Sequence, residues 1–125
     1  MRILVVDDSM MSRMILMKNI SAAAPGAFID QASNGQQGVD MVRVSVEKSS
    51  PYNIVFLDCL MPVVDGIQAL RQIRVIDPDR PVVMVTANIQ NKIKEEAEEL
   101  KCIAFLNKTG DSAAIAAIFK SLVSV

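Results

Sequence analysis

Short runs of branched apolar residues that end in charged side chains constrain this chain more than any other feature. Asp7 and Asp8 follow the first run, Asp58 follows a middle run, and Lys108 follows the last one. Such runs are typical of strands buried on both faces, as in a parallel sheet. Chains of this kind gather chemistry at the carboxyl ends of their strands. We therefore expect three carboxylates and one ammonium group to meet at one point.

The expected cluster of carboxylates indicates a metal ion. Close carboxylates repel one another, so such a cluster persists only with a cation that offsets its charge. Mg²⁺ prefers oxygen ligands, carboxylates among them. The sequence therefore predicts a magnesium site that involves Asp7, Asp8 and Asp58.

Strand and helix signals alternate along the whole chain. The strands are expected at about 2–6, 27–32, 52–57, 81–85 and 103–106. Capping and turn residues predict five helices. The first runs from Ser9 to about 22, the second from the turn at 33–35 to about 49, the third over 65–77, the fourth over about 89–100, and Asp111 caps the fifth. This alternation predicts an α/β fold in one domain over 1–125, with a parallel sheet covered by helices on both faces.

Composition excludes several classes of function. The net charge is −1 with no basic block, which argues against nucleic acid and anionic membranes as partners. No apolar stretch approaches the roughly 18 residues that membrane insertion needs. Cys59 and Cys102 form neither a disulfide framework nor a CxxC motif, which favours inert thiols and a cytoplasmic location. Histidine is absent, so any phosphohistidine in this chemistry must come from another protein or domain.

Four motifs, in chain order, resemble the receiver domains of two-component response regulators, specifically the stand-alone CheY-like kind. They are the acidic pair in 5–9, the segment from Asp58 to Gly66, Thr86-Ala87, and Lys108. Each motif alone is weak, but all four at the expected strand ends are specific, and the resemblance covers essentially the whole chain. It implies a doubly wound, flavodoxin-like sheet with the strand order 2-1-3-4-5.

The resemblance also implies a role for each matching carboxylate. Asp58 would be the phosphoacceptor. Asp8, Asp58 and the backbone carbonyl of Leu60 would bind Mg²⁺ directly, and Asp7 would hold the metal largely through water. Transfer to a carboxylate meets anion–anion repulsion, which a metal reduces, and phosphoryl transfer depends on positioning and charge more than on acid–base groups.

The remaining matching residues would detect the phosphoryl group. Thr86 would donate its hydroxyl to a phosphoryl oxygen, and Lys108 would pair with the group as a point charge. Phe105 stands at the aromatic switch position and could move into the space that Thr86 leaves. The surface formed by the fourth helix, fifth strand and fifth helix would then change.

The expected partners follow from this reading. A histidine kinase or a phosphotransfer protein would donate the phosphoryl group near the first helix, where Met11 and Ile15 are candidate contacts. Most of the apolar run over 10–20 is nevertheless expected to fill the core. A downstream protein target is implied, in chemotaxis, a phosphorelay or another pathway. The fifth helix has a small, smooth face that would suit a homodimer.

Two positions depart from the family pattern. Receivers usually carry proline after the lysine, often with a cis bond, and Thr109 stands there in this chain. A cis bond without proline costs about 2.5–4 kcal/mol, so we expect a trans 108–109 peptide. Leu60 lies beside the path of an attacking water that leucine cannot orient, and Asn88 is the other neighbour that could do so. We therefore expect slow self-dephosphorylation.

The favoured function is a signalling switch that catalyses only its own phosphorylation and dephosphorylation. Two other functions stay open. A phosphate-independent scaffold with a receiver-like fold is kept open by Thr109. A metal-dependent aspartyl phosphatase of the haloacid dehalogenase type also uses a strand-end aspartate and Mg²⁺. That family requires a second aspartate at the position of Leu60, and leucine cannot serve as the acid–base group that this aspartate provides.

Overall fold

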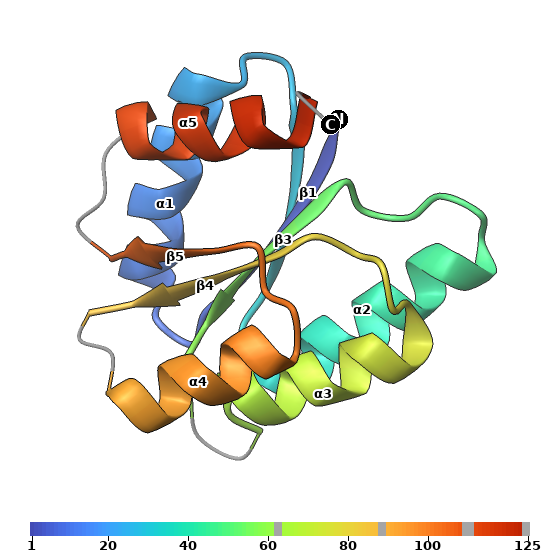
Figure 1. Cartoon of the computed structure of the whole chain (residues 1–125). Coiled ribbons are helices and arrows are strands. Elements are labelled where there is room, and N and C mark those ends of the chain that lie inside the picture. The colour runs from blue at the N-terminus through green and yellow to red at the C-terminus, as the bar shows by residue number, and fades with distance from the viewer. Residues whose placement is uncertain (62–63, 88–89, 109–111, 124–125) are drawn as a thin grey trace.

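A computed structural model describes residues 1–61, 64–87, 90–108 and 112–123, and its five parallel strands lie in the order β2-β1-β3-β4-β5 (Figure 1). Strands and helices alternate as predicted: β1 (Arg2–Val6), α1 (Met10–Ala23), β2 (Phe28–Ala32), α2 (Gly35–Glu47), β3 (Ile54–Asp58), α3 (Gly66–Ile76), β4 (Val82–Thr86), α4 (Asn91–Glu99), β5 (Ala104–Asn107) and α5 (Ser112–Val123). The predicted fold class and strand order are confirmed.

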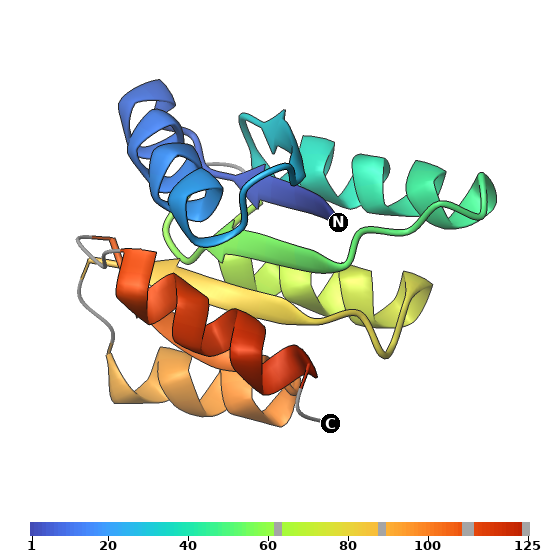
Figure 2. The same cartoon turned by 90° about the horizontal axis from the view of Figure 1, so that it is seen from above.

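Helices cover both faces of the sheet (Figure 2). Side chains along a strand alternate between the faces, so β1 sends Ile3 and Val5 to one core cluster and Leu4 and Val6 to another. The first cluster is closed by α1 and α5, and the second by α2, α3 and α4. The strands β1, β3 and β4 are nearly or fully buried along their apolar length, which explains their continuous apolar sequence.

Polar side chains fix where α1 and α3 begin. The Ser9 side chain accepts a hydrogen bond from the Ser12 N–H, so the predicted cap of α1 is confirmed. Asp65 and Gln68 form a reciprocal capping box at the start of α3. The predicted start of the fourth helix at Ile89 and the predicted cap Asp111 lie outside the described residues, as do Asn88 and Thr109.

The prediction that most of the apolar run in α1 fills the core is wrong. Only Leu16 and Ile20 of this helix are buried. The exposed large apolar side chains on α1 are Met10, Met11, Met14 and Ile15. The helix packs with a single face against the sheet and α5, and one face cannot bury apolar residues that occur on nearly all sides. An apolar surface therefore remains open on α1.

The parallel arrangement brings the carboxyl ends of all five strands to one edge of the sheet, where the arrowheads of β4 and β5 point in Figure 1. Backbone register pairs Val6 with Leu57, Asp58 with Val85, and Thr86 with Asn107. Residues that follow the strands are thus neighbours in space, although they are far apart in sequence. Among the helices that the described residues form, none has the length and apolar character needed to cross a bilayer.

Candidate functional site

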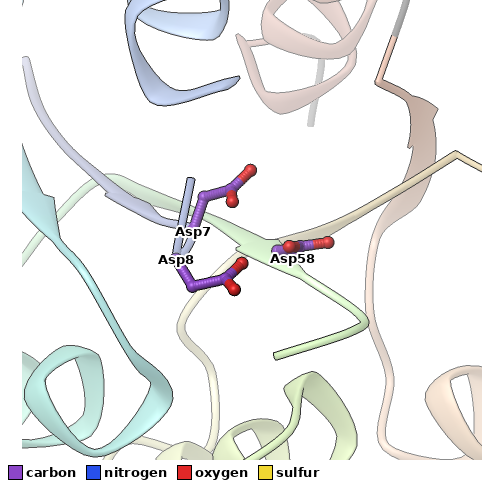
Figure 3. A group of neighbouring side chains, drawn as sticks. All are labelled: Asp7, Asp8 and Asp58. Carbon is purple, nitrogen blue, oxygen red and sulfur yellow. The ribbon is translucent and has the colours of Figure 1, made fainter. Parts of the chain in front are cut away.

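Three carboxylates gather at this edge of the sheet (Figure 3). Asp7 and Asp8 lie side by side at the end of β1, and Asp58 at the end of β3 lies opposite them. One oxygen from each lies within 4.8 Å of the others. Asp7 and Asp58 are only 2% exposed, whereas Asp8 is exposed. The predicted acidic cluster is therefore present, with one member open to solvent.

Local hydrogen bonds hold Asp7 in position. The Ser9 N–H donates to Asp7 Oδ1 over 2.9 Å, and the Asp7 N–H donates to the carbonyl of Ala32 over 3.1 Å. From α1, Arg13 Nη1 donates to the Asp7 carbonyl over 2.7 Å. The backbone and the carboxylate of this residue are thus fixed before any ion binds, which is the preorganisation that a metal site needs.

A close approach of α3 to β3 shapes the backbone around Asp58. A Cβ atom on Gly66 would lie 2.3 Å from the Asp58 carbonyl oxygen and 2.7 Å from Cys59 Cα, so only glycine fits. The Leu60 N–H points toward Asp58 Oδ1 at 3.4 Å. Sequence reasoning used Asp65-Gly66 as a helix start and as the end of the motif that begins at Asp58, and it did not predict this close approach of Gly66 to the β3 backbone.

Lys108 reaches the carboxylates from the end of β5. Its Nζ lies 3.2 Å from Asp58 Oδ2 and 3.4 Å from Asp7 Oδ2. The Lys108 N–H donates to the Thr86 carbonyl over 2.9 Å, which continues the β4–β5 pairing past the last strand residue. The ammonium group therefore bridges the two buried acids. The conformation of the peptide to Thr109 lies outside the described residues and stays a prediction.

Burial and neighbouring charges shift the pKa values of two groups in this cluster, Asp58 and Lys108. Burial raises the pKa of Asp58 to about 6, the charge of Asp7 adds to this effect, and Lys108 opposes it. Burial alone would lower the pKa of Lys108, but its hydrogen bond to Asp58 and the charges of Asp58 and Asp7 raise it overall. The ionised carboxylate of Asp58 thus needs more positive charge than Lys108 supplies.

The donor set fits a hard divalent cation. Three ionised carboxylates against one ammonium group leave two negative charges in excess, and the gathered ligand atoms are all oxygens. Oxygen ligands suit Mg²⁺, which also keeps several of its waters, and the exposed side of the cluster at Asp8 leaves access for them. Asp7, Asp8 and Asp58 are the residues that would hold the ion.

The other predicted site residues differ in how deeply they are buried. Thr86 is buried at the end of β4. Phe105 is half-buried against the core on the α2–α4 side, with Lys94 Nζ 5.8 Å from its ring centroid. The side chain of Leu60 is 65% exposed. Met11 and Ile15 are exposed on α1, and their part in a partner contact stays a prediction.

Comparisons with known proteins agree with the fold. Residues 3–120 match the response regulator receiver domain. The chain is 37% identical to protein CcdB of Bacillus subtilis over 107 residues, which are 86% of this chain and 84% of that protein. It is 36% identical to the two-component response regulator ORR41 of Oryza sativa over 87 residues, or 70% of this chain and 66% of the rice protein.

A solved receiver-domain structure has the same fold as this chain. The receiver domain of the histidine kinase CKI1 from Arabidopsis thaliana, in complex with Mg²⁺ and BeF₃⁻, superposes with a TM-score of 0.85 at 25% identity. The match covers 99% of this chain and 90% of that one. The fold and the acidic site define a receiver domain of two-component signalling. This chain belongs to the response regulator receiver domain family.

Proposed function

We propose that this receiver domain is a phosphorylation-controlled switch whose phosphoacceptor is Asp58. The observation that carries the proposal is the position of Lys108, which bridges Asp7 and Asp58 inside a buried acidic cluster. A lysine at this point serves as a ready cation for an incoming phosphoryl group. The donor would be a phosphohistidine of a histidine kinase or phosphotransfer protein, because this chain contains no histidine.

The transfer step follows from the groups present. An Asp58 oxygen attacks phosphorus, the new O–P bond forms, and the P–N bond to the donor imidazole breaks. The imidazole nitrogen keeps that electron pair and takes a proton from solvent water. Bound Mg²⁺ would offset the negative charge on the carboxylates and phosphoryl oxygens. Lys108 would exchange its contact with Asp58 for a phosphoryl oxygen, and Thr86 would donate its hydroxyl to another.

The switch would act through residues next to the site. When Thr86 turns toward the phosphoryl group, Phe105 can move inward from its half-buried position. That movement would end its contact with Lys94 on α4 and change the surface of α4, β5 and α5. A downstream protein that reads this surface would then distinguish the two states.

The exposed apolar surface of α1 supports a contact with the donor. Met11 and Ile15 remain 72% and 51% exposed, although large apolar side chains usually find cover. The helix begins two residues after Asp8, so a protein bound on it would lie beside the acidic cluster. Methionine repacks easily against different partners. We assign donor recognition to these two side chains.

Self-association through α5 belongs to the same proposal. The outer face of α5 carries small exposed residues such as Ala113 and Ala117. Light scattering of the wild type and of Ala117→Glu tests this contact. A dimer fraction that falls in the variant supports it, and a monomer in both proteins contradicts it.

Phosphorylation by a small acyl phosphate tests the proposed function without a partner. We expect Mg²⁺-dependent incorporation of one phosphoryl group, which disappears in Asp58→Asn. Asp40→Asn is the matched control, because Asp40 is an exposed acid on α2 that pairs with Arg43 and does not belong to the acidic cluster. Turnover of many substrate molecules would favour a phosphatase, and no incorporation at all would favour a scaffold.

A further inference from the structure

The helix α4 is weakly built at its N-terminal end. Of its nine residues only Ala97 is buried, and this residue lies near the C-terminal end. The N-cap residue Gln90 gives no side-chain hydrogen bond to the first turn. Lysines stand in the N-terminal half and glutamates in the last turn, opposite to the charges that the helix dipole favours. The neighbouring helix α3, by contrast, begins with the Asp65–Gln68 capping box and has a basic residue in its last turn.

Arg74 of α3 holds the opposite end of α4. Its Nε donates to the carbonyl of Leu100 over 2.7 Å, and its Nη2 donates to the carbonyl of Lys101 over 3.2 Å. Its Nη1 donates to the carbonyl of Arg80, in the loop before β4, over 2.8 Å. The last carbonyls of a helix have no partner within the helix, so these bonds satisfy groups that need one. One half-buried guanidinium thus joins the end of α4 to α3 and to the loop that follows α3.

The backbone forms a second anchor at this end of α4. The Lys101 N–H donates to the Glu98 carbonyl over 2.9 Å, and the Cys102 N–H donates to the Ala97 carbonyl over 3.1 Å. These two bonds form a Schellman motif. Lys101 has a φ of 61°, in the left-handed region that favours glycine. The helix end is therefore closed at a backbone cost, and the bond from Arg74 to the Lys101 carbonyl helps to hold this conformation.

The two ends of α4 lie at opposite edges of the sheet (Figure 1). The helix begins after β4, whose carboxyl end lies beside the acidic cluster, and it ends before β5. Near the N-terminal end, Lys94 Nζ lies 5.8 Å from the ring centroid of Phe105, and Ile93 is partly buried against the core. The weakly built end of α4 thus lies at the edge of the site and contacts the residue that moves in the proposed switch.

We propose that α4 is hinged at its C-terminal end, with Arg74 as the positioning residue, and that activation opens the helix from its N-terminal end. When Phe105 turns inward, Lys94 loses its aromatic contact, and the first turns keep the partly buried Ile93. The last turn stays in place, because the bonds of Arg74 and of the Schellman motif do not involve Phe105. The surface that a partner reads is therefore the first half of α4 together with β5. The inference rests on the proposed function, since it concerns how the same site changes that surface.

Hydrogen exchange of single backbone amides, followed by NMR, tests where α4 opens. In the unliganded wild type we expect protection factors for Lys94 and Glu95 that are roughly 10-fold or more below those for Leu100 and Cys102, because local opening begins at the less stable end. Beryllofluoride with Mg²⁺ should lower the protection of Lys94 and Glu95 further and leave that of Leu100 and Cys102 unchanged. Equal protection along the helix would overturn the inference, as would a beryllofluoride effect at Leu100 and Cys102 alone.

Variants of two arginines on α3 isolate the part that Arg74 plays. Arg74→Met keeps an apolar stem but removes the donors, so the protection of Leu100 and Cys102 should fall about 10-fold, from the net worth of one or two hydrogen bonds. Arg71→Met is the matched control, because the exposed Arg71 contacts α4 through an ion pair at 3.8 Å and should not affect this protection. Adding Lys101→Gly to Arg74→Met should restore the protection of Cys102, because glycine closes the motif without the backbone cost. Full protection of Leu100 and Cys102 in Arg74→Met would contradict the role of this residue.

A helix cap at position 90 tests the other end through ligand binding. Gln90→Ser supplies an acceptor for the N–H groups of the first turn and should weaken beryllofluoride binding by roughly 2- to 5-fold, because it stabilises the closed helix. Gln90→Ala supplies no acceptor and should bind as the wild type does. Unchanged binding in Gln90→Ser, measured by calorimetric titration, would overturn the link between opening and activation. Failure of the wild type to bind beryllofluoride would instead refute the proposed function, whereas the exchange pattern of the unliganded domain would still decide where α4 is anchored.

Discussion

Removing the charge of Asp58 should stabilise the metal-free domain, although it destroys the proposed phosphoacceptor. The pKa of Asp58 rises from its ordinary value of 3.8 to about 6, chiefly through burial and then through the charge of Asp7. Each unit of such a rise is worth about 1.36 kcal/mol, so the ionised carboxylate destabilises the fold by about 3 kcal/mol at pH 7. Asparagine also weakens the bond to Lys108, which leaves an expected gain of roughly 1–2 kcal/mol in the free energy of unfolding.

The sign of the pH dependence follows from the same shift. Because the folded pKa is the higher one, the folded state binds more protons than the unfolded chain between about pH 4 and pH 6. Stability of the wild type relative to Asp58→Asn therefore rises as the pH falls through about 6, and the penalty disappears below the unfolded value of 3.8. At pH 5 the penalty should be roughly half of its value at pH 7.

Urea unfolding followed by circular dichroism, with a chelator present, measures this difference. Asp8→Asn is the control, because it removes the same charge from the exposed member of the cluster and should change stability less. Added Mg²⁺ should stabilise the wild type more than Asp58→Asn, since the ion binds the folded state. A variant less stable than the wild type at pH 7 without metal would refute the reasoning, as would a difference that is equal at pH 7 and pH 5.

Three more predictions concern the surroundings of the cluster. Alanine at both Met11 and Ile15 should slow transfer from a phosphorylated donor protein but not from an acyl phosphate, whereas alanine at Val75, an exposed apolar residue on α3, should change neither rate. Replacing Leu60 by Asn or Glu should change the decay rate of the phosphorylated form several-fold, and an unchanged rate would contradict the idea that leucine leaves the water unoriented. Gly66→Ala should lower the free energy of unfolding by about 1–3 kcal/mol, because its Cβ would meet backbone atoms; a variant as stable as the wild type in urea would contradict this close approach.

The fold and the acidic cluster could both be predicted from the sequence. Strands that are buried on both faces have continuous apolar runs, and these runs end where the chain leaves the sheet. Parallel strands then bring Asp7, Asp58 and Lys108 together whatever the loops between them do. This contact depends only on strand identity and order, which are the properties that periodicity and motif resemblance report.

Contacts that depend on exact packing could not be predicted in this way. The exposure of Met11 follows from the single face that α1 presents to the sheet, and an apolar run does not reveal which face that is. The pairing of Asp58 with Val85 depends on the register between β3 and β4, and register is fixed by the assembled sheet. The need for glycine at 66 depends similarly on how closely α3 approaches β3.

These packing contacts give the resting domain partners that activation must replace. Lys108 is already paired with Asp7 and Asp58. A phosphoryl group therefore does not find a free ammonium group; it gains only the difference between its contact with Lys108 and the contacts that Lys108 gives up. Single contacts of this kind are worth about 1 kcal/mol, so the difference is small compared with their sum. A small change at Lys108 should then shift the population of the active state several-fold while leaving the fold intact, because each 1.4 kcal/mol changes the ratio about tenfold.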